Sequence, residues 1–242
     1  GYCIQIYCDF SGYSDMAIGI ALLLGFKIPM NFNAPLTADS MTDFWRRWHI
    51  SLSTWIRDYV YISLGGNKKG TLRMYFNQMV AMTACGLWHG ASLNFIVWGV
   101  LHGALVCVHK FWSQTVLKHD RRYHPSGLRR FISVFITFHV LCFTWLFFRC
   151  KDFDAVWVMV KQMFTKFNPS VLPDVFMGYK YVFLLMIFAL LTHWIPDSWQ
   201  NRCVRILEKG GVLLSAIAIT IVIFIIMQVK SSDIQPFIYF QF

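Results

Sequence analysis

The uncharged run Gly211–Val229 constrains the fold of this chain more than any other feature of its sequence. A helix needs about 20 predominantly apolar residues to cross a hydrocarbon core of about 30 Å, and this run is close to that length. Only 14% of the 242 residues are charged, whereas soluble domains carry roughly 25%. Hydrophobic residues make up 57% of the chain. The sequence therefore predicts an integral membrane protein.

Four further apolar segments extend this prediction to an all-α, polytopic fold. They cover residues 1–26, 73–110, 131–148 and 181–195. The second of these is too long for one span, and the glycines between Gly86 and Gly90 are expected to divide it into two helices. Residues 153–167 are apolar but contain two lysines, which favours an amphipathic helix at the membrane interface. Since no repeat or low-complexity linker is present, we expect one membrane domain over residues 1–242.

The segment from Thr42 to Leu64 is rich in both aromatic and basic residues, and it is too charged to span a membrane. We expect an interfacial or re-entrant helix here. In one continuous helix, Trp45, His49 and Ser53 would recur at i, i+4 and i+8 and share a face. The prolines and asparagines of residues 27–40 predict a loop before this helix, with Thr37 or Ser40 as its N-cap. Residues 65–70 predict a turn after it.

The formal net charge of +10 is explained by membrane topology. The lysines and arginines cluster between apolar segments, as expected for cytoplasmic loops of a membrane protein, so we do not expect nucleic-acid binding. The seven cysteines form no CxxC pair and lie mostly in apolar runs. They are interpreted as small buried hydrophobic residues.

The strongest candidate for chemistry is His89, which lies between Trp88 and Gly90 inside a long apolar run. A titratable residue at membrane depth is a functional-site hypothesis by default. Desolvation disfavours the charged imidazolium, so His89 is expected to stay neutral near pH 7 and to accept a proton from a hydroxyl group. Trp88 is expected to wall the site. The alternative is a hydrogen-bonded structural histidine.

His49 is the second candidate, with three roles open: polarising a carbonyl, binding a carrier arm, or orienting His89. The alternative is that it anchors a helix at the interface together with the neighbouring arginines. His102 follows His89 by thirteen residues, a spacing that is not typical of a metal site, and no HExxH sequence is present. There is also no GxSxG, P-loop or GxGxxG motif. We therefore expect no bound metal and no bound cofactor.

These blocks occur in an order that resembles the membrane-bound O-acyltransferase (MBOAT) family, and in particular its bacterial alginate O-acetylation branch. The residues that carry the resemblance are Tyr7–Asp15, Asn31–Pro35, Asp43–Ser53, Arg57–Tyr61, Gly65–Asn67, Gly86–Gly90, Trp98–Gly99, Leu101–Gly103 and Phe237–Phe242. The resemblance is dense over residues 1–110 and over the last six residues. Members of the family are normally much longer, so this chain is expected to be a C-terminal portion that lacks the N-terminal helices.

The resemblance implies that His89 is the principal catalytic histidine and His49 its partner. The residues expected to line the site are Trp88, Trp45, Trp48, Asp9, Asp15, Arg57, Asp58, Asn67 and His102. The resemblance also implies transfer of an acyl group, above all acetyl, from a cytoplasmic thioester such as acetyl-CoA to an extracytoplasmic polysaccharide. A separate SGNH-hydrolase-like protein is the expected partner, and the expected location is the bacterial cytoplasmic (inner) membrane, in contact with membrane lipid. Tyr239 is a candidate acyl relay, because a phenyl ester is activated toward a second alcohol; the alternative is that the aromatic tail lies in the interfacial belt.

Two other functions remain open from the sequence. One is D-alanyl transfer to teichoic acid, which uses a carrier-protein thioester. The other belongs to a different class, a transporter or exporter subunit in which Asp9, Asp15 and His89 form a proton pathway. A transporter of this kind is expected to show symmetric inverted halves, and the sequence shows none.

Overall fold

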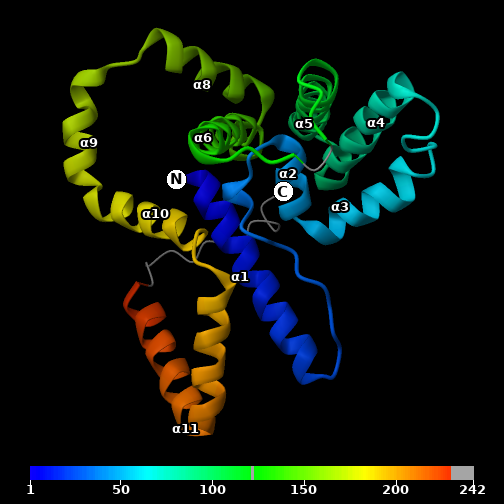
Figure 1. Ribbon diagram of the computed structural model, residues 1–242. Coiled ribbons are helices and arrows are strands. Elements are labelled where there is room, and N and C mark those ends of the chain that lie inside the picture. The colour runs from blue at the N-terminus through cyan, green and yellow to red at the C-terminus, as the bar shows by residue number, and fades with distance from the viewer. Residues whose placement is uncertain (121–122, 230–242) are drawn as a thin grey trace. The chain divides into compact units, whose positions relative to one another are not determined.

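A computed structural model describes residues 1–120 and 123–229, and within these ranges the chain is helical with no β-strand (Figure 1). The chain folds into two compact units, of which the first ends at His193 and the second begins at Trp194. The first unit begins with α1 (Tyr2–Leu23). The expected loop follows, and it contains one short 3-10 turn, η1 (Pro35–Thr37).

The aromatic and basic segment is not the continuous helix that the sequence predicted. It consists of α2 (Met41–Arg47), α3 (Ile50–Ile56) and the π-helical η2 (Arg57–Tyr61). Ser40 caps α2 as expected, because its side chain accepts a hydrogen bond from the backbone N–H of Asp43. The break lies at His49, which has a left-handed backbone (φ 44°, ψ 55°). The predicted i, i+4, i+8 face is therefore wrong at its central residue.

The loop before α2 supplies the hydrogen bonds that make this break. The backbone N–H of Asn33 donates to the carbonyl of Arg47 at 3.0 Å, and the N–H of Ile50 donates to the carbonyl of Asn31 at 3.0 Å. These bonds satisfy the end of one helix and the start of the next, so they replace the helical hydrogen bonds lost at His49.

Helices α4 (Thr71–His89) and α5 (Leu93–Lys110) form an antiparallel hairpin, which confirms the division expected near Gly90. Glycines allow the two backbones to approach closely. A Cβ atom on Gly86 would lie 2.2 Å from the carbonyl oxygen of Phe95, and one on Gly99 would lie 2.5 Å from the carbonyl oxygen of Met82. The turn predicted over residues 65–70 precedes α4 and is held by Asn77, whose amide donates to the carbonyls of Leu64 and Gly66.

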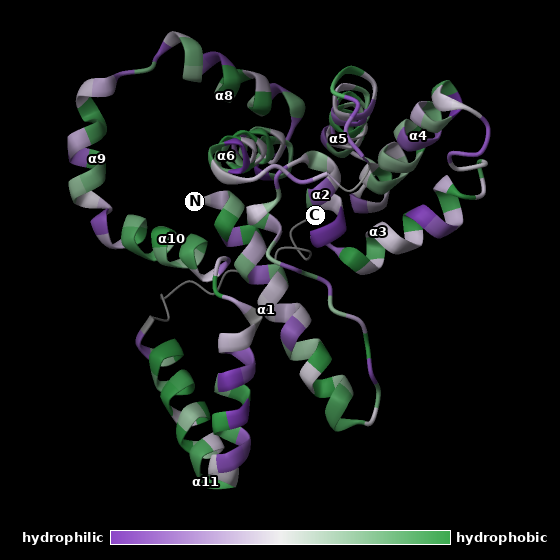
Figure 2. Ribbon diagram, in the orientation of Figure 1, coloured by the Kyte–Doolittle hydropathy of each residue, from purple (hydrophilic) through white to green (hydrophobic). Residues whose placement is uncertain are grey.

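The rest of the first unit continues from α5 through η3 (Phe111–Val116) to α6 (Gly127–Thr144) and α7 (Leu146–Arg149). Trp145, Phe147 and Phe148 are buried. Trp145 packs against Phe44 of α2, and Phe148 packs against Phe95 and Trp98 of α5. The elements that follow are α8 (Phe153–Thr165), η4 (Pro169–Val171), α9 (Leu172–Gly178) and α10 (Lys180–Thr192). Figure 2 shows α10 as almost uniformly hydrophobic, and none of its residues is buried.

The second unit contains α11 (Asp197–Val229), which is interrupted at Gly211 (φ 62°, ψ −156°). Most residues beyond this break are hydrophobic (Figure 2). Gly211 has a positive φ that side chains with a Cβ rarely adopt, so a glycine suits the interruption.

Three helices among the described residues are long and apolar enough to cross a membrane: Leu93–Val116, Gly127–Arg149 and Ser198–Gln228. A fourth candidate is the pair α9 and α10, which is bent by 82°. These findings confirm a polytopic helical membrane protein. The first predicted segment is a helix, α1, but it is not among these candidates.

Candidate active site

His89 is the last residue of α4 and lies in an aromatic enclosure built by three helices. Its ring centroid is 4.9 Å from that of Trp88, 5.3 Å from Trp98 on α5 and 5.0 Å from Phe148 on α7, and each pair is close to perpendicular. Gly90 follows with φ 152°, which ends the helix directly after the histidine. The sequence therefore places a half-buried titratable ring at the helix terminus, between the buried Trp98 and Phe148 and the more exposed Trp88, which has 52% relative exposure.

His49 meets the same enclosure from the break between α2 and α3. Its side chain is buried, with 7% relative exposure. The ring contacts Phe10 of α1 edge to face at 4.7 Å and Trp88 at 5.7 Å. The indole of Trp88 thus contacts both histidines, although they lie 40 residues apart in the sequence. The structure brings together the two residues that the sequence singled out.

Both histidines lie outside the candidate membrane spans, and both are shifted toward the neutral form. Burial lowers the pKa of His49 below its ordinary value. Burial also lowers the pKa of His89, and a charge on His49 would lower it further. A neutral imidazole at pH 7 retains a lone pair, so either ring can accept a proton or a hydrogen bond.

The hydrogen bonds of His49 identify its protonated nitrogen. Nδ1 lies 3.2 Å from Oδ1 of Asn31, and the same oxygen accepts from the backbone N–H of Ser51 at 3.1 Å and from its hydroxyl at 2.9 Å. Nε2 is buried and has no hydrogen-bond partner among the described residues. Asn31 and Phe10 were not singled out by residue-level reasoning, because they act from 18 and 39 residues away and leave no local pattern.

His102 differs from the other two histidines because both of its ring nitrogens are engaged. Nδ1 accepts from the indole N–H of Trp45 at 3.2 Å, and Nε2 lies 2.9 Å from the hydroxyl of Thr144. That hydroxyl donates to the carbonyl of Leu141, so it accepts from Nε2–H. His102 is fully buried, and its ring packs against Trp98 at 4.4 Å. It fixes two tryptophans, and its nitrogens are not available to a substrate.

The other predicted site residues are more dispersed. Trp48 is buried and packs against Phe44 at 5.6 Å with nearly parallel rings. Asp9 is half-buried beside Phe10, whereas Asp15 is exposed on α1. Arg57 and Asp58 are exposed and bind each other through two hydrogen bonds of 2.7 and 3.1 Å. Asn67 is exposed in the turn before α4, and Tyr239 lies outside the described residues.

A cavity of about 270 Å³ lies between α2, α3, α4 and α5. Its wall includes Ser53 and Cys85, which are one helical turn from His49 and His89. Its cationic residues are Arg46, Arg57 and Lys110. A second cavity, of about 180 Å³, shares Arg46 and Lys110 and is also lined by Asn67. The second cavity is also lined by one carboxylate, Asp120. Together the two cavities form a predominantly basic region next to the histidine site.

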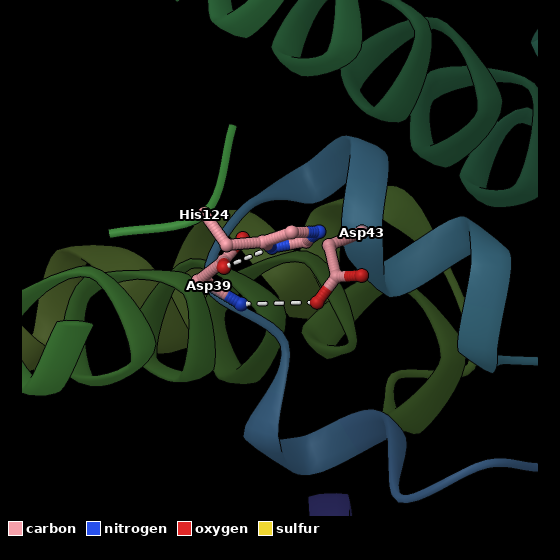
Figure 3. Close-up of side chains that lie close together, drawn as sticks. All are labelled: Asp39, Asp43 and His124. Carbon is pink, nitrogen blue, oxygen red and sulfur yellow. Dashed lines mark hydrogen bonds and ion pairs between the residues drawn. The ribbon is translucent and has the colours of Figure 1, made fainter. Parts of the chain in front are cut away.

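Figure 3 shows a cluster of Asp39, Asp43 and His124, whose potential ligand atoms lie within 4.8 Å of one another. Its members are already engaged with protein groups. His124 pairs with Asp39 at 2.6 Å, and Asp43 accepts from Arg47 at 2.8 Å and from the backbone of Asp39 at 3.4 Å. The cluster therefore ties the loop around His124 to the start of α2.

Fold and site together define a class of protein: a polytopic helical membrane protein with two histidines, one buried and one half-buried, in contact with aromatic rings. Residues 2–149, which contain every residue of that enclosure, match the family described as MBOAT, membrane-bound O-acyltransferase family. The chain belongs to this family.

Curated relatives in bacteria are similar to the same region. A probable alginate O-acetylase AlgI of Azotobacter vinelandii is 46% identical over 164 residues, which is 68% of this chain and 31% of that protein. A probable alginate O-acetylase AlgI of Pseudomonas putida is 34% identical over 260 aligned positions, covering 100% of this chain and 52% of that protein. A peptidoglycan O-acetyltransferase of Helicobacter pylori is 43% identical over 162 residues, 67% of this chain and 30% of that protein. The chain thus spans about a third to a half of the length of these relatives.

Proposed function

We propose that this chain carries the histidine site of an O-acyltransferase that moves an acetyl group from a cytoplasmic thioester toward hydroxyls of an extracytoplasmic polysaccharide. The observation that carries the proposal is the contact of His49, which is buried, and His89, which is half-buried, with the ring of Trp88. Burial lowers the pKa of both histidines, which favours their neutral forms. Membership of the family and similarity to proteins named as O-acetylases support the reaction class.

The chemistry assigned to the site is general-base catalysis. The oxygen of the acceptor hydroxyl attacks the carbonyl carbon of the thioester while the ring of His89 takes the hydroxyl proton. The carbon–sulfur bond then breaks, and the thiolate leaves with that proton, so His89 returns to its neutral state. Trp98 and Phe148, which are both buried, limit the access of water to this ring, and this protects the thioester from hydrolysis.

The basic region supports a phosphate-bearing thioester as the donor. Coenzyme A and the phosphopantetheine arm of a carrier protein both carry phosphate, which pairs well with arginine and lysine. Arg46 and Lys110 line both cavities, and Cys85 brings the larger one to within a helical turn of His89. We assign the donor to this side of the site, with no bound metal or cofactor in the reaction.

The acceptor is proposed from the names of the relatives. Alginate and peptidoglycan are both polysaccharides, and both names describe O-acetyl transfer. D-alanyl transfer is the second candidate, because a teichoic acid D-alanyltransferase of Bacillus subtilis is also similar, at 34% identity. An SGNH-hydrolase-like protein outside the bacterial cytoplasmic membrane would complete the transfer, with Tyr239 as an acyl relay.

The test uses the full-length protein in lipid vesicles with acetyl-CoA labelled on the acetyl group. His89→Ala is expected to abolish label transfer to the polysaccharide while membrane insertion is retained. His139→Ala is the matched control, because His139 is an exposed histidine on α6. Undiminished transfer by the His89 variant would rule out the assignment. Tyr239→Phe tests the relay separately, and full transfer in that variant would remove it.

The same vesicles distinguish the two acyl groups. In place of acetyl-CoA, the vesicles are given a carrier protein loaded with labelled D-alanine. No transfer of the labelled D-alanine is expected. Transfer of D-alanine with no transfer of acetyl would reverse the order of the two candidates.

A further inference from the structure

Asn31 is the hub of the break between α2 and α3. Its backbone carbonyl accepts from the N–H of Ile50 at 3.0 Å. Its side-chain oxygen accepts from the N–H and the hydroxyl of Ser51, and it lies 3.2 Å from Nδ1 of His49. One loop residue thus contacts three consecutive residues at the start of α3, including the candidate site histidine.

The donors around this hub determine which nitrogen of His49 carries the proton. A backbone N–H can only donate, so the Asn31 atom that lies 3.1 Å from the N–H of Ser51 must be the amide oxygen. An amide oxygen cannot donate, and the Ser51 hydroxyl, which lies 3.4 Å from Nδ1, gives its one hydrogen to the same amide oxygen at 2.9 Å. Nδ1 of His49 is therefore the donor in its contact with Asn31. A neutral imidazole has one N–H group, which leaves Nε2 of His49 with a lone pair.

The surroundings of Nε2 offer no alternative proton donor. This nitrogen is buried without a hydrogen-bond partner among the described residues. The rings that pack against His49 include those of Phe10 and Trp88, both of which meet it nearly edge to face. A buried lone pair without a partner is unusual in a folded protein, and a catalytic role is one explanation for such a group.

We propose that Asn31 is a positioning residue that fixes His49 as the Nδ1–H tautomer and so makes Nε2 its hydrogen-bond acceptor. The relevance of that nitrogen to acyl transfer rests on the proposed function; the tautomer itself does not. The assignment narrows the three roles open for His49. A neutral ring whose Nε2 carries no proton cannot donate a hydrogen bond from that nitrogen to a thioester carbonyl. His49 therefore acts by accepting a hydrogen bond at Nε2, which orients the group that donates the bond.

The direct test is ring nitrogen NMR on full-length protein labelled with ¹⁵N-histidine in lipid nanodiscs at pH 7. Nδ1 of His49 is expected to show the shift of a protonated nitrogen and Nε2 that of an unprotonated one. The signal is assigned by its loss in His49→Gln. Asn31→Leu, which removes the acceptor, is expected to shift the population toward Nε2–H. A wild-type ring protonated on Nε2 would overturn the proposal, whether or not the protein transfers acyl groups.

A second test uses a charge change that preserves the hydrogen bonds. In Asn31→Asp, the carboxylate can accept from the same donors, so folding is expected to be retained. Its negative charge next to Nδ1 should raise the pKa of His49 by about 1–3 units. The acid limb of the profile of acyl-transfer rate against pH should move to higher pH by a similar amount. The effect should appear in kcat, and the KM for the acyl donor should change little.

The matched control is Asn33→Asp, which adds the same charge two residues away on an exposed side chain. Its acid limb should stay at the wild-type position. If Asn31→Asp folds but its acid limb coincides with that of the control, Asn31 only closes the loop and the proposal fails. If the NMR result holds but the wild-type protein transfers no acyl group, the tautomer assignment stands and the proposed function fails.

Discussion

Replacing Gly99 by alanine tests whether the α4–α5 hairpin depends on backbone contact. The new Cβ would lie 2.5 Å from the carbonyl oxygen of Met82 and 3.2 Å from both the Cα and the nitrogen of Gly86. All three atoms belong to the backbone of α4, so no side-chain rotation can relieve the overlap. The two helices must move apart by roughly 1 Å to restore ordinary van der Waals contact.

The magnitude follows from two opposing effects. Alanine has a higher helix propensity than glycine by about 0.8–1 kcal/mol. Overpacking a well-packed core costs about 1–3 kcal/mol. Separating the two helices by about 0.5–1 Å also weakens each dispersion contact between α4 and α5 by roughly a quarter to a half. Since the obstructing atoms cannot yield, the upper part of that range applies. We expect Gly99→Ala to lower the free energy of unfolding by about 2 kcal/mol.

Unfolding can be followed in detergent micelles through labelling of the thiol of Cys85, which is buried on α4 next to Gly86. Gly19→Ala on α1 is the matched control, because its Cβ would meet nothing within 4 Å, and it should be stabilised by a few tenths of a kcal/mol to about 1 kcal/mol. Gly103→Ala should fall between the two, since its nearest contact is the flexible side chain of Met79 at 3.0 Å. Equal stability of Gly99→Ala and Gly19→Ala would refute the reasoning.

Four further predictions address the site. Thr144→Val removes the acceptor of His102 Nε2–H and leaves a buried donor unsatisfied, so the free energy of unfolding should fall by about 1–3 kcal/mol in the same labelling assay. Because burial lowers the pKa of both His49 and His89, the acyl-transfer rate should stay on its plateau below pH 6.5. Stability should fall as the pH drops below 6.5, because the unfolded chain then binds protons that the folded chain does not; a constant melting temperature between pH 7 and pH 5 would contradict this. Arg46→Gln should raise the KM for acetyl-CoA about tenfold with kcat unchanged, as expected from loss of one charge-assisted hydrogen bond, whereas a fall in kcat alone would argue against donor binding there.

Local sequence signals predicted the parts of this fold that depend on local chemistry. The N-cap at Ser40 and the end of α4 at Gly90 were both expected, because each depends on a side chain or a glycine at the position itself. The membrane spans were also expected in part, since length and apolar composition are local properties. The helix break at His49 was not expected. No glycine or proline marks it, and the bonds that stabilise it come from Asn31 and Asn33.

The different roles of His89 and His102 could be distinguished only from the structure. His102 and His89 both lie in apolar runs, and the sequence treated both as site residues. The partners that satisfy His102 are 57 and 42 residues away, on α2 and at the end of α6, and no pattern in one sequence connects them. The tautomer of His49 depends in the same way on an amide 18 residues away.

The break at His49 also explains how one short segment serves two neighbouring spaces. A continuous helix would place Trp45, His49 and Ser53 on one face, and Trp45 and Ser53 do line the same cavity. His49 does not line it, because the left-handed residue interrupts the helix between them. The ring instead meets Phe10 and Trp88. The backbone hydrogen bonds of Asn31 and Asn33 stabilise the break, so His49 does not line the basic cavity and lies beside the aromatic enclosure of His89. The side chain of Asn31 then determines which nitrogen of His49 carries the proton.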